Sequence, residues 1–412
     1  MSGDGKLRQA QLLAGFGPGA MIDLPEEAVI VSGLEGWRSW GSRRRIHEER
    51  LEARLAEMLC PPGETPREVP LYAPPTDEVE SPDPKKHGVV VYRFPLWFLV
   101  QVDETFVGPT GIRYRTRPFV HSRSVESGRQ GLFFRWRDNR AKPVVPIRFV
   151  QACARGHISD VNWHAFVRRD FSTSRSGQLW LDEGGAGNDF TEIFVRDEAS
   201  GQRRPLADAG VKNARPLGHC PGEQPWLGPG LREGNCGEIN TLLNRSATNA
   251  YFSQTLSAIA IPDQQSALRA AIDRVYDGYL QYADDESDIS RERRKAQVAE
   301  ALKDLSDTAV WAEVARRKQG RPVQKRSIKQ VEIETLLQAP NGGDAPPHGD
   351  FFARSRPVGT LPASLLGKLD RVVLVHRLRE VVAQVGFTRL EAEQPDEDGE
   401  LKLDVKRAQL AR

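Results

Sequence analysis

Three cysteines and two histidines of this 412-residue chain lie at spacings that could support metal binding. Cys153 and His157 are four residues apart across a turn, so a thiolate and an imidazole can reach the same ion. Cys220 and Cys236 flank a loop rich in Pro and Gly and could supply two further positions of a tetrahedral Zn²⁺ site. His219 competes with His157 for the histidine position. These residues are therefore candidate ligands of a structural zinc site.

Other interpretations of these residues stay open. They could be buried free thiols beside histidines that cap loops, because tandem Cys-x-x-Cys pairs are absent. They could also form the centre of a metal-dependent hydrolase. A further possibility is a thiol hydrolase with Cys153 as the nucleophile and His157 as its base, although no oxyanion-stabilising group can be recognised. The sequence contains no G-x-x-x-x-G-K-[ST] phosphate loop, so we do not expect this chain to be an ATP-driven motor.

The overall composition restricts how the chain could bind other molecules. Its 58 basic and 56 acidic residues nearly balance, so any nucleic-acid surface must be a local patch. Four cysteines are too few for a secreted disulfide scaffold, and the N-terminus lacks the pattern of a signal peptide. No apolar run is long enough to cross a bilayer. We expect a cytoplasmic protein that does not associate with a membrane.

The order of hydrophobic patterns predicts an α+β fold, in which a mixed, β-rich core carries the candidate zinc site and a helical insertion follows it. Strand-like runs dominate the first two thirds of the chain, and helical spacing begins near Gln264. We expect four parts: a strand and helix segment (1–60), a β-rich Cys/His core (88–262), a charged helical arm (263–340) and a C-terminal helical segment (341–412) that continues into a domain missing from this chain.

The helical arm is the candidate DNA-binding region. We expect one long charged helix from Ser290 to Lys318, in which basic residues cluster and could contact phosphates. Interleaved glutamates favour the alternative of a solvated helix face. Near the cysteine segments, Arg155 and His164 are further candidates for DNA contact. The arm residues proposed for this role are Arg293, Arg294, Arg316, Arg317, Lys318 and Arg321.

Several short motifs occur in consistent order over most of the chain and together resemble one known family. They are Leu7–Gln11, Phe16–Ala20, Arg93–Trp97, Arg148–Cys153 with Gly156–His157, Pro225–Gly228, Arg245–Phe252, Arg377–Glu380 and Gly386–Arg389. As a set they resemble the DrmB family, the helicase-associated component of the bacterial DISARM anti-phage defence systems. The resemblance implies a non-catalytic partner of an SNF2-like helicase, DrmA, in a complex that engages DNA. ATP would then be bound by the helicase and not by this chain.

The chain departs from the pattern of that family in two respects. Family members commonly carry a Cys-x-x-Cys pair after the Phe-Pro-x-Trp strand and another before His219, but Val100–Asp103 and Phe194–Arg203 contain no cysteine here. A zinc site is thereby reduced to the three cysteines named above and one histidine. The family also usually continues beyond Arg389 into a further Cys-containing domain, so we expect a C-terminal portion to be missing.

Overall fold

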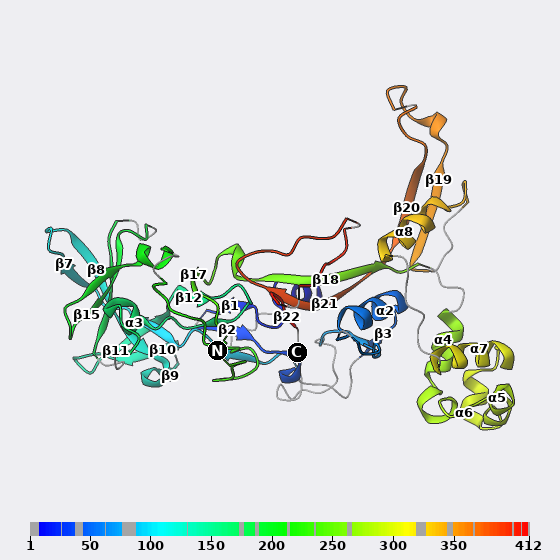
Figure 1. The fold of residues 1–412 in the computed structure, drawn as a ribbon, viewed down its shortest axis with the longest axis horizontal. Coiled ribbons are helices and arrows are strands. Elements are labelled where there is room, and N and C mark those ends of the chain that lie inside the picture. Colours follow the sequence, from blue (N-terminus) through cyan, green and yellow to red (C-terminus); the bar gives the residue numbers. More distant parts are fainter. Residues whose placement is uncertain are drawn as a thin grey trace.

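The computed structural model defines most of the chain. The residues it describes are 8–25, 27–37, 44–61, 63–75, 88–129, 131–172, 177–185, 189–211, 215–234, 236–261, 266–318, 327–343, 349–365, 367–397, 399–404 and 406–410. Helices and several antiparallel sheets combine into the expected α+β fold. The molecule is elongated, with a β-rich body at one end, a helical body at the other and a long two-stranded ribbon between them (Figure 1).

The β-rich end is built on a nine-stranded antiparallel sheet. Its strands run in the order β16-β15-β14-β8-β6-β11-β10-β9, and β7 pairs with β8 outside this path. Phe119, Trp163 and Leu179 belong to the buried core beneath it, where the short helix α3 (Trp163–Arg168) also packs. The strands are β6 (Trp97–Val100), β7 (Glu104–Val107), β8 (Arg113–His121), β9 (Glu126–Gly128), β10 (Gly131–Arg135), β11 (Ala141–Pro146), β14 (Leu179–Glu183), β15 (Ile193–Asp197) and β16 (Arg203–Pro205).

Two small sheets form the middle of the molecule and carry the candidate metal centre. One consists of β1 (Met21–Asp23), β2 (Ala28–Val31) and β5 (Val91–Arg93). The other consists of β12 (Phe149–Ala152), β13 (Ile158–Ser159) and β17 (Thr241–Asn244). Ile30, Val150, Trp226 and Phe387 from distant segments share one buried core here, so this core joins the N-terminal, central and C-terminal parts of the chain.

A long antiparallel ribbon extends from this middle region. It pairs β18 (Phe252–Ile259) with β21 (Glu380–Thr388), and β22 (Gln409–Leu410) joins it at its inner end. Helix α1 (Gln9–Ala14) lies at the inner end, where the Ser253 hydroxyl donates to the Leu13 carbonyl oxygen at 2.5 Å. Helix α2 (Glu49–Met58) buries Leu51 and Leu55 against the ribbon, and α8 (Ile328–Leu337) adds Ile328 to the same core. The short strands β3 (Arg45–Ile46) and β4 (Leu71–Tyr72) pair beside α2.

The helical insertion does not contain the long helix expected from Ser290 to Lys318. Four helices, α4 (Ser266–Asp273), α5 (Glu286–Glu292), α6 (Ala296–Ala301) and α7 (Asp307–Lys318), fold back on one another with a π-helical turn at Tyr276–Leu280. The apolar residues are spaced for mutual burial, and Ile289, Val298 and Val310 are each fully enclosed. Arg293 donates to the Leu302 and Leu305 carbonyl oxygens, which secures the turn after α6. Compact packing therefore replaces a single extended helix.

The expectation of a helical C-terminal segment over 341–412 is wrong. The described residues form β19 (Phe351–Arg356), β20 (Val372–Leu378), β21 and β22, with only a short 3-10 turn at Val358–Thr360. Strands β19 and β20 make a hairpin that projects from the outer end of the ribbon (Figure 1). Valines dominate β20 and the start of β21, and β-branched residues favour strands over helices. Apolar spacing alone had suggested a helix.

Within the described part of the chain, none of the helices combines the length and hydrophobicity needed to cross a lipid bilayer.

Candidate metal centre

The turn between β12 and β13 positions Cys153 and His157. Ala152 pairs with Ile158 across the two strands, and the tight turn that joins them places both side chains on its inner side. The Cys153 N–H donates to the His157 carbonyl oxygen at 3.1 Å, and the Gly156 N–H donates to the Cys153 carbonyl oxygen at 3.0 Å. Gly156 adopts a φ of +81°, which an L-residue disfavours. The local sequence therefore closes the turn that brings thiol and imidazole together.

A second loop, between Gly218 and Ile239, supplies the other two cysteines. The Cys220 N–H donates to the Glu238 carbonyl oxygen at 2.7 Å, and the Glu233 N–H donates to the Gly222 carbonyl oxygen at 2.8 Å. The two sides of the loop approach so closely at Gly222 that a Cβ there would lie 2.0 Å from the Gly234 carbonyl oxygen. Glycine at position 222 is therefore required for Cys220 and Cys236 to face the same space.

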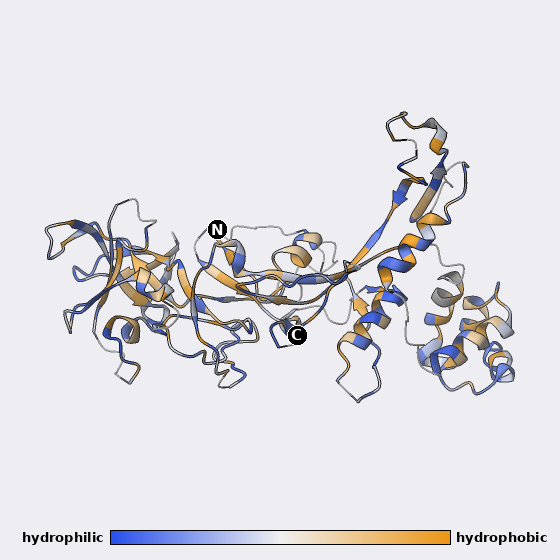
Figure 2. Ribbon diagram, turned by 45° about the horizontal axis from the view of Figure 1, so that its top comes forward, coloured by the Kyte–Doolittle hydropathy of each residue, from blue (hydrophilic) through white to orange (hydrophobic). Residues whose placement is uncertain are grey.

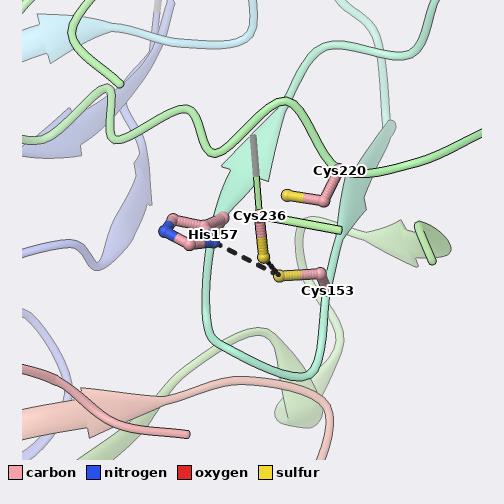
Figure 3. Close-up of side chains that lie close together, drawn as sticks. All are labelled: Cys153, His157, Cys220 and Cys236. Atoms are coloured by element: carbon pink, nitrogen blue, oxygen red, sulfur yellow. Dashed lines mark hydrogen bonds between the residues drawn. The ribbon is translucent and has the colours of Figure 1, made fainter. Parts of the chain in front are cut away.

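The four side chains converge on one point. The Sγ atoms of the three cysteines and a ring nitrogen of His157 all lie within 4.8 Å of one another (Figure 3). Cys153 Sγ is 3.5 Å from His157 Nδ1 and 3.9 Å from Cys236 Sγ. Zn–S and Zn–N bonds of normal length give tetrahedral edges of about 3.5 Å for S···N and about 3.8 Å for S···S. The cluster thus has the dimensions of a four-coordinate metal centre.

The ionisation of each group in the cluster depends on its neighbours. A hydrogen bond from Cys220 and interactions with His157 lower the pKa of Cys153 to about 4, against the effect of burial. The hydrogen bond with Cys153 and burial raise the pKa of Cys220, and burial raises the pKa of Cys236. The pKa of His157 is raised because its contacts with Cys153 and Glu233 outweigh burial. Without a cation, the cluster can hold a thiolate at Cys153 but opposes ionisation of the other two thiols.

The residues around the cluster support ligation. His157 Nε2 lies 2.7 Å from a Glu233 carboxylate oxygen, which orients the imidazole so that Nδ1 faces the thiols. Arg155 donates to Cys236 Sγ at 3.8 Å and to Glu233 at 2.9 Å. The Gly222 N–H donates to Cys220 Sγ at 3.3 Å. A carboxylate behind a histidine and N–H donors to sulfur are typical of the second layer of a metal site.

The donor set fits Zn²⁺ in a structural role. Three thiolates and one neutral imidazole fill all four tetrahedral positions with protein atoms and leave no position for water or substrate. A divalent ion would also remove the electrostatic penalty that opposes ionisation of Cys220 and Cys236. Bound to three thiolates and a neutral histidine, the ion would leave the centre with a net charge of about −1.

A buried arginine lies behind the turn of the metal centre. Arg389 is 1% exposed, and its guanidinium donates to the carbonyl oxygens of Gly156 at 3.0 Å, Ala250 at 2.6 Å and Gly19 at 2.5 Å. The guanidinium also faces the ring of Phe387 at 4.9 Å. Burial lowers the pKa of Arg389 to about 10, so it stays charged at neutral pH. No carboxylate forms an ion pair with Arg389 among the described residues.

The residues proposed for DNA contact in the helical insertion are mostly engaged with acidic partners. Arg293 bonds to Asp307 at 2.6 Å, and Lys318 bonds to Asp284 at 3.0 Å. Arg316 and Arg317 both pair with the buried Glu313, at 2.7 and 2.9 Å. They make further ion pairs with Glu49 and Asp273, respectively. Arg294 is exposed, and Arg321 lies outside the described residues.

The other candidates lie in or near the centre. His219 is exposed, with its Nδ1 3.1 Å from the Gly237 carbonyl oxygen, so the structure brings His157 and not His219 to the cysteines. Arg155 is partly exposed beside the cluster. His164 is 4% exposed and packs edge-on against Trp97 at 6.2 Å, so its ring is not presented to a nucleic acid in this structure.

Sequence reasoning missed the roles of Glu233 and Arg389. Glu233 lies three residues before Cys236, and an acidic residue beside a ligand is a signal that could have marked it. Arg389 closes the Gly-Phe-Thr-Arg motif, but its partner Gly19 is 370 residues away. Only the fold could connect them.

Comparison with known proteins places the chain in a family. A family model described as a domain of unknown function, DUF8724, matches residues 8–252, and the chain belongs to this family. The match covers the N-terminal segment, the β-rich body and the metal centre.

A comparison with one curated protein is more specific. The DISARM protein DrmB of Bacillus paralicheniformis is 26% identical to this chain over 263 residues. The matched region covers 61% of this chain and 45% of that protein, so the chain spans less than two thirds of its relative. The expected resemblance to DrmB is confirmed.

Proposed function

We propose that this chain is a non-catalytic component of a DISARM anti-phage defence complex. It scaffolds an SNF2-like helicase of the DrmA type and contributes to the DNA-binding surface, while the helicase binds ATP. The observation that carries the proposal is the similarity to the DISARM protein DrmB, which spans 263 residues. The proposed site of action is the cytoplasm, where phage DNA enters the cell.

In this proposal, Cys153, His157, Cys220 and Cys236 hold a structural Zn²⁺ ion. The ion would join the β12–β13 turn to the loop between Gly218 and Ile239, two segments that are far apart in the sequence. The supporting observation is the closed set of four protein ligands with tetrahedral dimensions. Such an ion stabilises the folded loops and takes no part in chemistry on a substrate.

A metal-dependent hydrolase is the alternative function. Catalytic zinc sites usually keep one position open for water, whereas four protein side chains converge here. The centre is also largely enclosed, since Cys153, His157 and Cys220 are each buried. The hydrolase hypothesis predicts turnover that disappears when Cys153 or Cys236 is replaced. The scaffold hypothesis predicts no turnover.

Co-expression with the neighbouring helicase tests the proposal. The complex and each separate subunit are titrated with DNA across a range of salt concentrations, and bound zinc is measured in the same samples. We expect co-purification, about one zinc per chain, and tighter DNA binding by the complex than by either subunit. A chain that neither joins the helicase nor alters its DNA binding would refute the scaffold function. Hydrolytic turnover by the isolated chain would favour the alternative.

A further inference from the structure

The positive charge of this molecule is not concentrated in the helical arm, where the sequence suggested it. Residues 266–318 contain ten basic and eleven acidic side chains, and the arginines at the centre of the insertion pair with buried or half-buried carboxylates. Residues 349–379, which form the β19–β20 hairpin, contain six basic and only two acidic side chains, a formal net charge of +4. The hairpin is therefore the more cationic of the two projecting parts.

Two arginines of the hairpin keep most of their positive charge. Arg354 donates to the neutral carbonyl oxygen of Gly343 at 3.4 Å. A hydrogen bond to a carbonyl leaves the positive charge of a guanidinium intact, whereas an ion pair cancels it. Arg379 pairs with Asp350 at 3.2 Å, but both side chains are more than half exposed, so this pair is weak.

The shape of the hairpin suits a nucleic-acid groove. It projects from the outer end of the β18–β21 ribbon, clear of the β-rich body (Figure 1). Six residues of β19 pair along β20, which gives a two-stranded ribbon about 20 Å long. Such a ribbon fits the major groove of a duplex, about 12 Å wide. Figure 2 shows both hydrophilic and hydrophobic stretches along this ribbon.

The tip of the hairpin, residues 357–371, combines apolar and basic side chains. Leu365 and Leu369 are each 40% exposed, and Lys368 and Arg371 beside them are also exposed. The two exposed leucines give the tip an apolar surface between its cations. Proteins that distort nucleic acids often press such apolar side chains against base steps while cations hold the phosphates.

We infer that the β19–β20 hairpin is the element that engages a nucleic-acid duplex. Its cations contact the phosphates, and Leu365 and Leu369 at its tip press against the bases. This inference rests on the proposed function and deepens it, because it assigns the DNA contact to the hairpin and not to the helical insertion.

Matched charge-removing variants test the phosphate contact. One variant of the full chain carries R356Q, K368Q and R371Q in the hairpin, and the other carries R294Q, K295Q and K303Q in the insertion. Both remove three positive charges, so they have the same net charge. A fluorescent 20-base-pair DNA duplex is titrated between 50 and 200 mM salt, with the helicase partner present in all samples. We expect at least tenfold weaker binding and a salt slope lower by about 2–3 for the hairpin variant, and less than a twofold change for the insertion variant.

The tip is tested separately with L365S and L369S together. We expect the salt slope to be unchanged, while the fluorescence increase of a 2-aminopurine base in the duplex is lost. An unchanged fluorescence response overturns the contact between the leucines and the bases. An R356K, R371K variant keeps the charge and should bind as the wild type does, which separates loss of charge from damage to the fold.

The outcomes distinguish this inference from the proposed function. If the wild-type complex binds DNA and the hairpin variant binds equally well, the hairpin inference is overturned while the scaffold function stands. If addition of the wild-type chain leaves the DNA binding of the helicase unchanged, the DNA-binding part of the proposed function fails, and the hairpin inference with it.

Discussion

Replacement of Arg389 is the most informative perturbation of the metal-centre region. Its guanidinium joins three segments that are distant in sequence, through the carbonyl oxygens of Gly19, Gly156 and Ala250. Arg389→Met keeps an unbranched apolar side chain of similar length but removes the charge and all N–H donors. Arg389→Lys keeps the charge but lacks the planar fork that reaches three acceptors.

The expected loss follows from these contacts. Three buried carbonyl oxygens left without donors cost about 1–3 kcal/mol each. Removal of a buried cation returns several kcal/mol, because the guanidinium no longer has to be desolvated. The net expectation for Arg389→Met is a loss of about 2–4 kcal/mol in the free energy of unfolding of this region. Arg389→Lys should lose a similar amount, because its ammonium group cannot satisfy all three carbonyls.

The two variants should differ in metal affinity. With Zn²⁺ bound, the centre would carry a net charge of about −1, and Arg389 is the buried cation behind its turn. We expect Arg389→Met to weaken zinc binding by about tenfold, in the range seen for residues that support metal ligands. Arg389→Lys should retain more of the affinity, because it keeps the positive charge.

Hydrogen exchange and a chelator competition titration measure the two effects. In Arg389→Met, amide protection should fall together in the peptides that contain Gly19, Gly156 and Ala250, and urea denaturation should give the change in free energy. Loss of protection in only one of the three peptides would refute the view that Arg389 joins them. Equal zinc affinities for the Met and Lys variants would refute the role of its charge.

Three further predictions concern the metal loop, the metal itself and the insertion. Gly222→Ala should lower the free energy of unfolding by more than about 2 kcal/mol and weaken zinc binding, because its Cβ would meet a carbonyl oxygen on the facing side of the loop. Gly230→Ala, also at positive φ but in open space, should cost only about 1 kcal/mol. Thermal denaturation compares the two variants. Cys236→Ser should reduce bound zinc, measured by elemental analysis, while Cys60→Ser, outside the cluster, should leave one ion per chain. Glu313→Gln should destabilise the insertion by about 2 kcal/mol, because two arginines lose their carboxylate. The pKa of Glu313 is lowered by those arginines despite burial, so its contribution is present above about pH 4.5 and is lost as the pH falls; circular dichroism of wild type and variant should converge in acid.

Local patterns were sufficient to predict several elements. Leu51, Leu55 and Met58 lie one turn apart, and α2 buries the first two. Val29–Val31 is a continuous β-branched run, and with Ala28 it forms the fully buried β2. The metal cluster was predictable because cysteine and histidine are rare in this chain and the turn spacing between Cys153 and His157 restricts their geometry.

Long-range packing explains what sequence reasoning could not predict. The apolar positions between Ser290 and Lys318 fit one long helix or several short ones. Several short helices form because Val298 and Val310 are both buried in the shared core of the insertion. The valines of β20 fit both helical and strand spacing. Pairing with β19 makes this segment a strand. The choice between His157 and His219 depended on a loop closed by Gly222, which no local pattern reveals.

The way the insertion joins the ribbon has an evolutionary consequence. Strand β18 ends at Ile259 and α8 begins at Ile328, yet these ends meet, since the Ile259 N–H donates to a Glu332 carboxylate oxygen at 2.7 Å. The insertion between them has a core of its own. A segment whose two ends coincide can be lost, lengthened or exchanged in a single genetic event without moving the ribbon. Variation in length among relatives should therefore concentrate between Ile259 and Ile328, so that lineages can exchange this unit while the ribbon and the metal centre are inherited unchanged.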